Sequence, residues 1–199
     1  MKMLCLGDSL TYGYGLRRRE TWPYLLQEKL KSEGMEIQII NKGISGDTTS
    51  GMLFRFQSAL EENPDLLFLM GGSNDICMAG SIAMAKNNFT AMISRCLAEE
   101  RRLILGIPTP IFWEELTDQW RFYVKGPETI ELCDRLFAEW ADWLLLMADR
   151  YQIPILDFRT IIPRSRIQKS SIYLDGLHLN QKGQIIMADT FAKKIGKIY

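Results

Sequence analysis

Five short runs of apolar residues recur along the chain at intervals that suit a repeating unit. Each run has four or five residues, and most are apolar at successive positions rather than at every second one. This composition is typical of strands in a parallel sheet, because such a sheet is buried on both faces. The strands predicted from these runs are Met3–Leu6, Glu36–Ile40, Leu66–Met70, Leu103–Ile107 and Ile153–Leu156.

Amphipathic stretches separate the apolar runs. In one of them Ile130, Cys133, Phe137 and Trp140 recur at spacings of three and four, which places them on one face of a helix. Alternation of strands and helices through five repeats predicts a doubly wound α/β fold, and 199 residues suit one domain, residues 1–199. The predicted helices are Thr21–Glu33, Thr49–Glu62, Ser81–Arg101, Pro127–Arg150 and Gln181–Ile198.

Two long segments without a clear period interrupt this pattern, Pro108–Gly126 and Asp157–Asn180. Segments of such length in a compact domain are usually functional loops or lids. Within the first, residues 111–123 predict a short helix with one aromatic face, which could cover a site, pack on the core or form a subunit interface. The residues of that face are Phe112, Trp113, Leu116, Trp120 and Tyr123.

Charge and hydropathy narrow the classes of partner. Lys plus Arg and Asp plus Glu both number 24, so the zero net charge gives no sign of a nucleic-acid partner. No window approaches the eighteen or so apolar residues of a membrane-spanning helix, so we expect no stable membrane insertion. The apolar run at the N-terminus is too short for a signal-peptide core, which predicts a cytoplasmic protein. A homodimer is compatible with this composition.

Metal and nucleotide sites lack their usual residues. The four cysteines are widely spaced and form no CxxC pair, so we expect reduced core thiols. With one histidine and no cysteine cluster, no metal site is predicted. The chain has no phosphate-binding GxxxxGK[ST] loop, and Gly13-Tyr14-Gly15 lacks the third glycine of a dinucleotide fingerprint. We therefore expect no cofactor.

Polar residues follow each of the first three predicted strands. The segments are Gly7-Asp8-Ser9-Leu10, Asn41 to Thr48, and Gly71 to Asp75. With the strand order 2-1-3-4-5, these loops lie side by side at the carboxyl edge of the sheet, with Ser9 in the middle. Ser9 would then stand between a glycine amide and a carboxamide, both donors that can stabilise an oxyanion. Taken alone, Ser9 could also be a helix N-cap, and the residues in the other two loops ordinary turn residues.

The candidate base for Ser9 is the one histidine of the chain, His178. Asp175 lies three residues before it, and Gly176 between them permits a tight turn. A carboxylate at this spacing can meet Nδ1 of the imidazole and leave Nε2 for the serine. A lone histidine can also be purely structural. The arrangement nevertheless predicts a serine nucleophile activated by a histidine.

These residues fall into four ordered blocks that resemble those of the GDSL/SGNH hydrolase superfamily. The blocks are GDSL at residues 7–10, Gly46 within SGDT, GSND at residues 72–75, and DGLH at residues 175–178, and they extend over almost the whole chain. The resemblance implies a three-layer α/β/α sandwich with a five-stranded parallel sheet of flavodoxin-like order 2-1-3-4-5. It also implies that Ser9 is the nucleophile, that His178 and Asp175 complete a catalytic triad, and that the oxyanion donors are Ser9, Gly46 and Asn74.

The remaining acidic residues of these blocks are expected to have structural roles. We expect Asp8 and Asp75 to hold the loops by hydrogen bonds, and Asp47 and Thr48 to cap the following helix.

The function expected from these residues is a cofactor-free serine esterase or acylhydrolase acting on small-molecule, lipid or sugar esters, with a preference for short acyl chains. A carbohydrate O-acetylesterase with the same mechanism is an alternative. A different class, a non-hydrolytic flavodoxin-like domain that binds a flavin or nucleotide, is the second alternative. A bound flavin would colour the protein yellow, whereas an esterase should be colourless and hydrolyse p-nitrophenyl esters.

Overall fold

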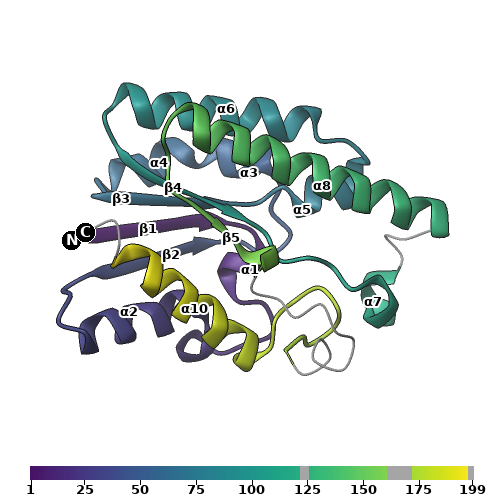
Figure 1. The fold of residues 1–199 in the computed structure, drawn as a ribbon, viewed down its shortest axis with the longest axis horizontal. Coiled ribbons are helices and arrows are strands. Elements are labelled where there is room, and N and C mark those ends of the chain that lie inside the picture. Colours follow the sequence, from purple (N-terminus) through teal and green to yellow (C-terminus); the bar gives the residue numbers. More distant parts are fainter. Residues whose placement is uncertain (122–125, 161–171, 197–199) are drawn as a thin grey trace.

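A five-stranded parallel sheet forms the middle layer of the molecule in a computed structural model that describes residues 1–121, 126–160 and 172–196 (Figure 1). The strand order is β2-β1-β3-β4-β5, which confirms the predicted order. The strands are β1 (Lys2–Gly7), β2 (Gln38–Gly43), β3 (Leu66–Met70), β4 (Arg102–Ile107) and β5 (Ile155–Asp157).

Successive side chains of a strand point to opposite faces, and β1 uses this alternation to build two cores. Leu4 and Leu6 belong to the hydrophobic cluster on one face, and Met3 and Cys5 belong to the cluster on the other. All four side chains are fully buried. The two-sided burial expected from the apolar runs therefore holds for the centre of the sheet.

The edge strand β2 departs from that expectation. Its residues are exposed or half-buried, because it pairs only with β1. The strand also begins and ends two to three residues later than the predicted Glu36–Ile40. Its last residues, Asn41 to Gly43, pair with Cys5 to Gly7. Polar residues can continue an edge strand because one side of the strand faces solvent.

One face of the sheet is covered by helices α3 (Thr49–Phe54), α4 (Phe56–Glu61), α6 (Ala83–Ala98) and α8 (Pro127–Arg150) (Figure 1). Their apolar side chains, among them Met52, Phe56, Phe89 and Trp140, form one cluster with that face.

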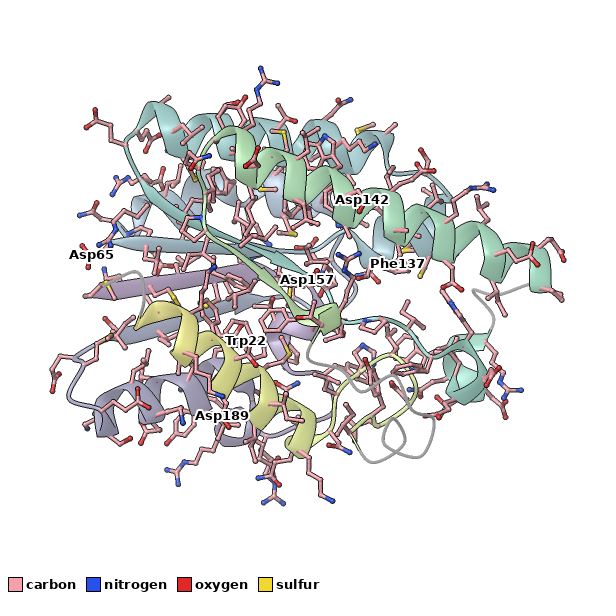
Figure 2. The ribbon with its side chains drawn as sticks, viewed as in Figure 1. Trp22, Asp65, Phe137, Asp142, Asp157 and Asp189 are labelled. Carbon is pink, nitrogen blue, oxygen red and sulfur yellow. The ribbon has the colours of Figure 1, made fainter. Side chains whose placement is uncertain are left out.

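Helices α2 (Trp22–Ser32) and α10 (Gln181–Ile195) cover the other face. Trp22 lies between them and the sheet, where its ring packs against Phe68 and Phe191 (Figure 2). Its indole N–H donates to the carbonyl of Leu10 at 3.0 Å, and its backbone N–H donates to Gln184 Oε1 at 2.7 Å. A fully buried tryptophan thus keeps both polar groups satisfied and joins α2 to the start of the chain.

One predicted helix and one predicted loop differ from the observed structure. The predicted helix over residues 49–62 is interrupted at Arg55, which ends α3 and precedes α4. A short helix, α5 (Ser73–Ala79), begins inside the GSND block, which the sequence pattern treated as a loop. The last predicted residues of the final helix, 197 and 198, lie outside the described residues.

Three further short elements lie where the strands end. The first helix, α1 (Ser9–Tyr12), follows β1 directly. The segment after β4 contains a 3-10 turn, η2 (Trp113–Glu115), and α7 (Asp118–Arg121), in place of one amphipathic helix. The remaining 3-10 turns are η1 (Arg18–Glu20) and η3 (Phe158–Thr160).

The four cysteines are free thiols, and all but the half-exposed Cys77 are buried. None of the helices in the described ranges combines the length and the apolar character needed to cross a lipid bilayer.

Candidate active site

Ser9 is the first residue of α1, immediately after the end of β1. Asp8 is the N-cap of this helix, and its Oδ1 accepts a hydrogen bond from Leu10 N–H at 2.9 Å. The backbone N–H groups of the first helical turn have no partner inside the helix, so that of Ser9 is available at the carboxyl edge of the sheet. The nucleophile predicted from GDSL therefore stands at a strand-to-helix turn.

His178 and Asp175 lie at the tip of a small hairpin formed by residues 172–180. Tyr173 and Leu179 form an antiparallel bridge, and Leu174 N–H donates to the carbonyl of His178 at 2.7 Å. Gly176 has φ +82°, and a Cβ there would come within 2.7 Å of the Phe112 carbonyl oxygen. The turn between the acid and the base therefore requires glycine.

The three predicted triad residues form a continuous chain of contacts. His178 Nε2 lies 3.0 Å from Ser9 Oγ, and His178 Nδ1 lies 2.8 Å from Asp175 Oδ2. Because the carboxylate accepts a hydrogen bond from Nδ1–H, the neutral imidazole presents its Nε2 lone pair to the serine hydroxyl. This arrangement can remove the hydroxyl proton during a nucleophilic attack.

The environment of Asp175 keeps its carboxyl group ionised. Burial alone would raise the pKa of Asp175, but hydrogen bonds from the His178 ring, the His178 N–H and the Leu177 N–H outweigh burial and lower it. The two backbone donors reach Oδ1 at 2.7 Å and 3.0 Å. An ionised carboxylate is the form that can orient and stabilise an imidazolium.

Gly46 and Asn74 face the same edge of the sheet from the two loops beside Ser9. Gly46 has φ +78°, and a Cβ built on it would meet no atom within 4 Å, so this part of the loop borders open space. Asn74, in the first turn of α5, donates from Nδ2 to the carbonyl of Asp47 at 2.7 Å. A carboxamide has two N–H donors, so this bond orients the group and leaves one donor for a ligand.

Arg55 joins the elements that carry these donors. Its guanidinium donates to the carbonyl of Gly7 at 2.8 Å, to the carbonyl of Lys42 at 2.5 Å and to Asp47 Oδ2 at 2.8 Å. The Asp47 side chain therefore pairs with Arg55, and the prediction that it caps the next helix is wrong. Thr48 is the N-cap, with its hydroxyl accepting from Gly51 N–H, as expected.

Asp75 holds the third loop against α3. Its carboxylate accepts from the backbone N–H of Thr49 at 2.9 Å and from the Thr49 hydroxyl at 2.6 Å. Asn88 of α6 in turn donates to the Thr49 hydroxyl oxygen. The structural role expected for Asp75 is thus visible in its contacts, and the same holds for Asp8 as an N-cap.

Sequence patterns missed two contacts at this site. Arg55 lies inside a predicted helix, and nothing in the sequence indicates that its guanidinium reaches the ends of β1 and β2. Trp120 was singled out for its place in an aromatic stripe, yet its indole N–H donates to Asp175 Oδ2 at 2.6 Å. A single sequence holds no signal for a hydrogen bond between residues 55 positions apart.

The predicted aromatic face over residues 111–123 is divided among several environments. Leu116 is buried, whereas Phe112, Trp113 and Trp120 are half-buried, and Tyr123 lies outside the described residues. The described part of this segment contacts the hairpin that carries His178 and Asp175, through Phe112 N–H to the carbonyl of Gly176 at 2.8 Å. The segment therefore covers the acid side of the triad.

Between Tyr14 and this segment the acid side of the triad stays partly open to solvent, at a depression that Ser9 and His178 do not line. A solvent-open depression of about 500 Å³ lies beside Asp175. Among the described residues, no group of three or more His, Cys, Asp or Glu side chains is placed to hold a metal ion. The depression is lined by Tyr14, Gly15, Thr117, Asp118, Gln119, Leu174 and Asp175.

The sequence of the chain matches a known protein family. The sequence model of the GDSL-like Lipase/Acylhydrolase family matches residues 5–185. The chain belongs to this family. Each of the four sequence blocks lies within the matched residues.

Curated relatives include esterases and a thioesterase. The chain is 36% identical over 138 residues to "Esterase TesA" of Pseudomonas aeruginosa, which covers 68% of this chain and 63% of that protein. It is 24% identical over 195 residues to "Thioesterase 1/protease 1/lysophospholipase L1" of Escherichia coli, covering 97% and 82%. The match to the Pseudomonas relative therefore spans less than two thirds of that relative's length.

Solved structures share the fold over nearly the whole chain. The psychrotrophic esterase EstA from Pseudoalteromonas is similar with a TM-score of 0.74 and 26% identity, covering 98% of this chain and 97% of that one. A lipolytic protein of the G-D-S-L family from Desulfitobacterium hafniense gives a TM-score of 0.75 at 20% identity, covering 97% and 98%. The α/β fold of the family is thus present here.

The burial of Asp8 generates a prediction about stability. Burial, together with the nearby Asp47 and Asp75, raises the pKa of Asp8 to about 7, against the lowering effect of the Leu10 hydrogen bond. The folded protein then holds this proton more tightly than the unfolded chain, whose Asp titrates near pH 4. The free energy of unfolding should therefore fall as pH rises from about 4 to about 7, by at most about 4 kcal/mol from this group.

Asp8→Asn carries no titrating group and should lack this part of the pH dependence. Urea unfolding at several pH values between 4.5 and 7.5 should show the variant gaining stability relative to the wild type as pH rises. Parallel profiles for the two proteins across this range would show that Asp8 titrates as an ordinary carboxyl.

Proposed function

We propose that this protein hydrolyses carboxylic esters through an acyl-enzyme on Ser9. The observation that carries the proposal is the contact chain from Ser9 Oγ to His178 Nε2 and from His178 Nδ1 to Asp175, placed between the Gly46 loop and Asn74. A base within 3.0 Å of a serine hydroxyl, itself oriented by a carboxylate, is the arrangement needed to activate that hydroxyl.

In the first half-reaction, Ser9 Oγ attacks the ester carbonyl carbon while His178 Nε2 takes the hydroxyl proton. The carbonyl oxygen gains negative charge and accepts hydrogen bonds from the Ser9 N–H, the Gly46 N–H and the Asn74 carboxamide. The imidazolium then gives its proton to the leaving alkoxide, and the alcohol departs. Water then attacks the acyl carbonyl carbon while His178 Nε2 takes its proton, and the imidazolium returns that proton to Ser9 Oγ as the bond from Ser9 to the carboxylic acid breaks.

Family membership and the names of relatives support this choice of reaction. An arylesterase of Vibrio mimicus is 38% identical over 94 residues, which is 47% of both chains. Esterases and thioesterases both transfer an acyl group to a nucleophile through a tetrahedral intermediate, so the same site serves either bond. We place oxygen esters first, because the relatives at 36% and 38% identity are named as an esterase and an arylesterase.

The roles of Ser9 and His178 generate a prediction about activity and labelling. Ser9→Ala, His178→Ala and the double variant should each lose p-nitrophenyl acetate hydrolysis to a similar extent, because residues that act as one unit are not additive. A fluorophosphonate probe should label the wild type on the peptide that contains Ser9.

Ser58→Ala is the matched control, because Ser58 is an exposed serine on α4, outside the four sequence blocks. This variant should keep both activity and labelling. An adduct on another serine, or full turnover by Ser9→Ala, would rule out Ser9 as the nucleophile. Circular dichroism and thermal melting verify that the inactive variants are folded.

The carboxamide of Asn74 generates a second prediction about catalysis. Asn74→Ala should lower kcat by about 10²–10³-fold with little change in KM, because the carboxamide bonds the developing oxyanion more strongly than the ground-state carbonyl. Asn41→Ala is the control and should leave kcat unchanged. The Asn41 carboxamide bonds main-chain atoms of Thr11, Tyr12 and Gly43. A rise in KM at constant kcat for Asn74→Ala would assign Asn74 to binding instead.

We also propose a preference for short acyl chains. The loop at Gly46 borders open space, and the rings of Tyr14 and Trp120 lie against His178 as a short aromatic wall. A shallow site offers little apolar contact to a long chain, and each methylene in a fitted pocket contributes about 1–3 kcal/mol to discrimination.

A panel of p-nitrophenyl esters from acetyl to octanoyl, together with an acetylated xylo-oligosaccharide, tests this preference. The value of kcat/KM should be highest for the acetyl or butyryl ester. A maximum at octanoyl would overturn the proposed chain-length preference, and turnover only of the acetylated sugar would assign the protein to the carbohydrate acetylesterases.

A further inference from the structure

The carboxylate of Asp175 accepts more hydrogen bonds than a triad acid needs in order to hold its histidine. Oδ1 accepts from the N–H groups of Leu177 and His178, and Oδ2 accepts from His178 Nδ1 and from Trp120 Nε1. A carboxylate has about four lone-pair positions, so these four bonds fill its capacity. The carboxylate plane is thereby fixed from two sides.

Trp120 is the one contributor to this set from outside the catalytic turn. The segment that bears it is attached to the turn by main-chain bonds, from Phe112 N–H to the Gly176 carbonyl at 2.8 Å and from Thr117 N–H to the Asp175 carbonyl at 3.3 Å. Gly176 lets the segment approach, since a Cβ there would meet the backbone of Phe112, Glu115 and Leu116. The indole N–H is therefore delivered to Oδ2 by a docked backbone.

The rings around His178 complete this arrangement. The Trp120 ring centroid lies 5.1 Å from that of His178, and the Tyr14 ring centroid lies 4.4 Å from it. Tyr14 and Trp120 also contact each other edge to face at 5.5 Å. Two aromatic rings thus limit the rotation of the imidazole, while Asp175 selects its tautomer.

We propose that Trp120 is a positioning residue, whose indole N–H holds Asp175 Oδ2 toward His178 and draws off part of the carboxylate's negative charge. This role rests on the proposed function. This role has two consequences, because Asp175 Oδ2 accepts hydrogen bonds from both the Trp120 indole and the His178 ring. The imidazole is held with Nε2 toward Ser9, and the negative charge that faces its Nδ1 is shared between two hydrogen-bond donors.

Other charged groups near the triad lie on the same segment or at the ends of the strands. The segment contributes Glu114, Glu115, Asp118 and Arg121, of which Glu114, Asp118 and Arg121 are exposed. The strand ends contribute Asp8, next to Ser9 in the chain, and the Asp47–Arg55 pair. Replacing Trp120 leaves each of these charged groups in the chain.

Trp120→Phe keeps an aromatic ring and removes the N–H. Because His178 is the single histidine of the chain, its imidazole can be titrated by NMR without assignment. The pKa of this imidazole should rise by about 0.5–1 unit in the variant, since an unshared carboxylate favours the imidazolium more strongly. The acid limb of the kcat/KM profile should move up by the same amount, and kcat at pH 8 should fall by about 10-fold with KM little changed.

Trp113→Phe is a matched control. The indole N–H of Trp113 also donates to an aspartate at 2.6 Å, Oδ1 of Asp134 on α8, away from the triad. Both tryptophans attach the same segment, but only Trp120 reaches Asp175. The largest effect expected of Trp113→Phe is a lower melting temperature. The histidine titration and the pH profile should be unchanged.

An unchanged imidazole pKa and pH profile in Trp120→Phe would overturn the proposal. An equal shift in Trp113→Phe would also overturn it, because loosening of the segment would then be the cause. Trp120→Met removes the N–H and the ring together and repeats the test if Trp120→Phe does not fold. The NMR titration needs no turnover, so it separates failure of this role from failure of Ser9 as the nucleophile, which the fluorophosphonate label reports.

Discussion

A buried carboxylate needs hydrogen-bond donors, and this requirement determines how the loops at the carboxyl edge of the sheet are held. Asp175 takes its donors from its own turn and from Trp120, and Asp75 takes its donors from Thr49 at the start of α3. Asp47 pairs with Arg55, which also bonds the last carbonyls of β1 and β2. Each acid therefore joins a loop that bears a functional group to a neighbouring element of the fold.

Asp8 differs from these acids because it has fewer hydrogen-bond donors. It is buried, accepts one bond from Leu10 N–H, and its Oδ2 has no partner among the described residues. Its raised pKa follows from its burial and from the neighbouring carboxylates of Asp47 and Asp75. The residue before the nucleophile thus caps α1 at a cost in stability that grows with pH.

Much of this arrangement is predictable from the sequence, because the strands are apolar runs and the functional residues follow them directly. The rule that ligands bind where parallel strands end pointed to Ser9, while the strand order and the completion of the triad by His178 and Asp175 followed from the resemblance of the four sequence blocks to a known family. The polar edge strand β2 and the short helix α5 were harder, since partial burial and a helix of seven residues leave no period in the sequence. Arg55 and the indole of Trp120 were not predictable, because long side chains reach partners that only the packed structure brings near.

The central claim is that Ser9, Gly46 and Asn74 surround one oxyanion position beside the Ser9–His178–Asp175 chain. A crystal structure of the protein after reaction with an alkylphosphonate tests it most directly, because the tetrahedral phosphorus imitates the intermediate. We expect phosphorus bonded to Ser9 Oγ, and one phosphoryl oxygen about 2.7–3.1 Å from Ser9 N, Gly46 N and Asn74 Nδ2. An adduct on Ser9 whose phosphoryl oxygen points to solvent, away from Gly46 and Asn74, would contradict the account.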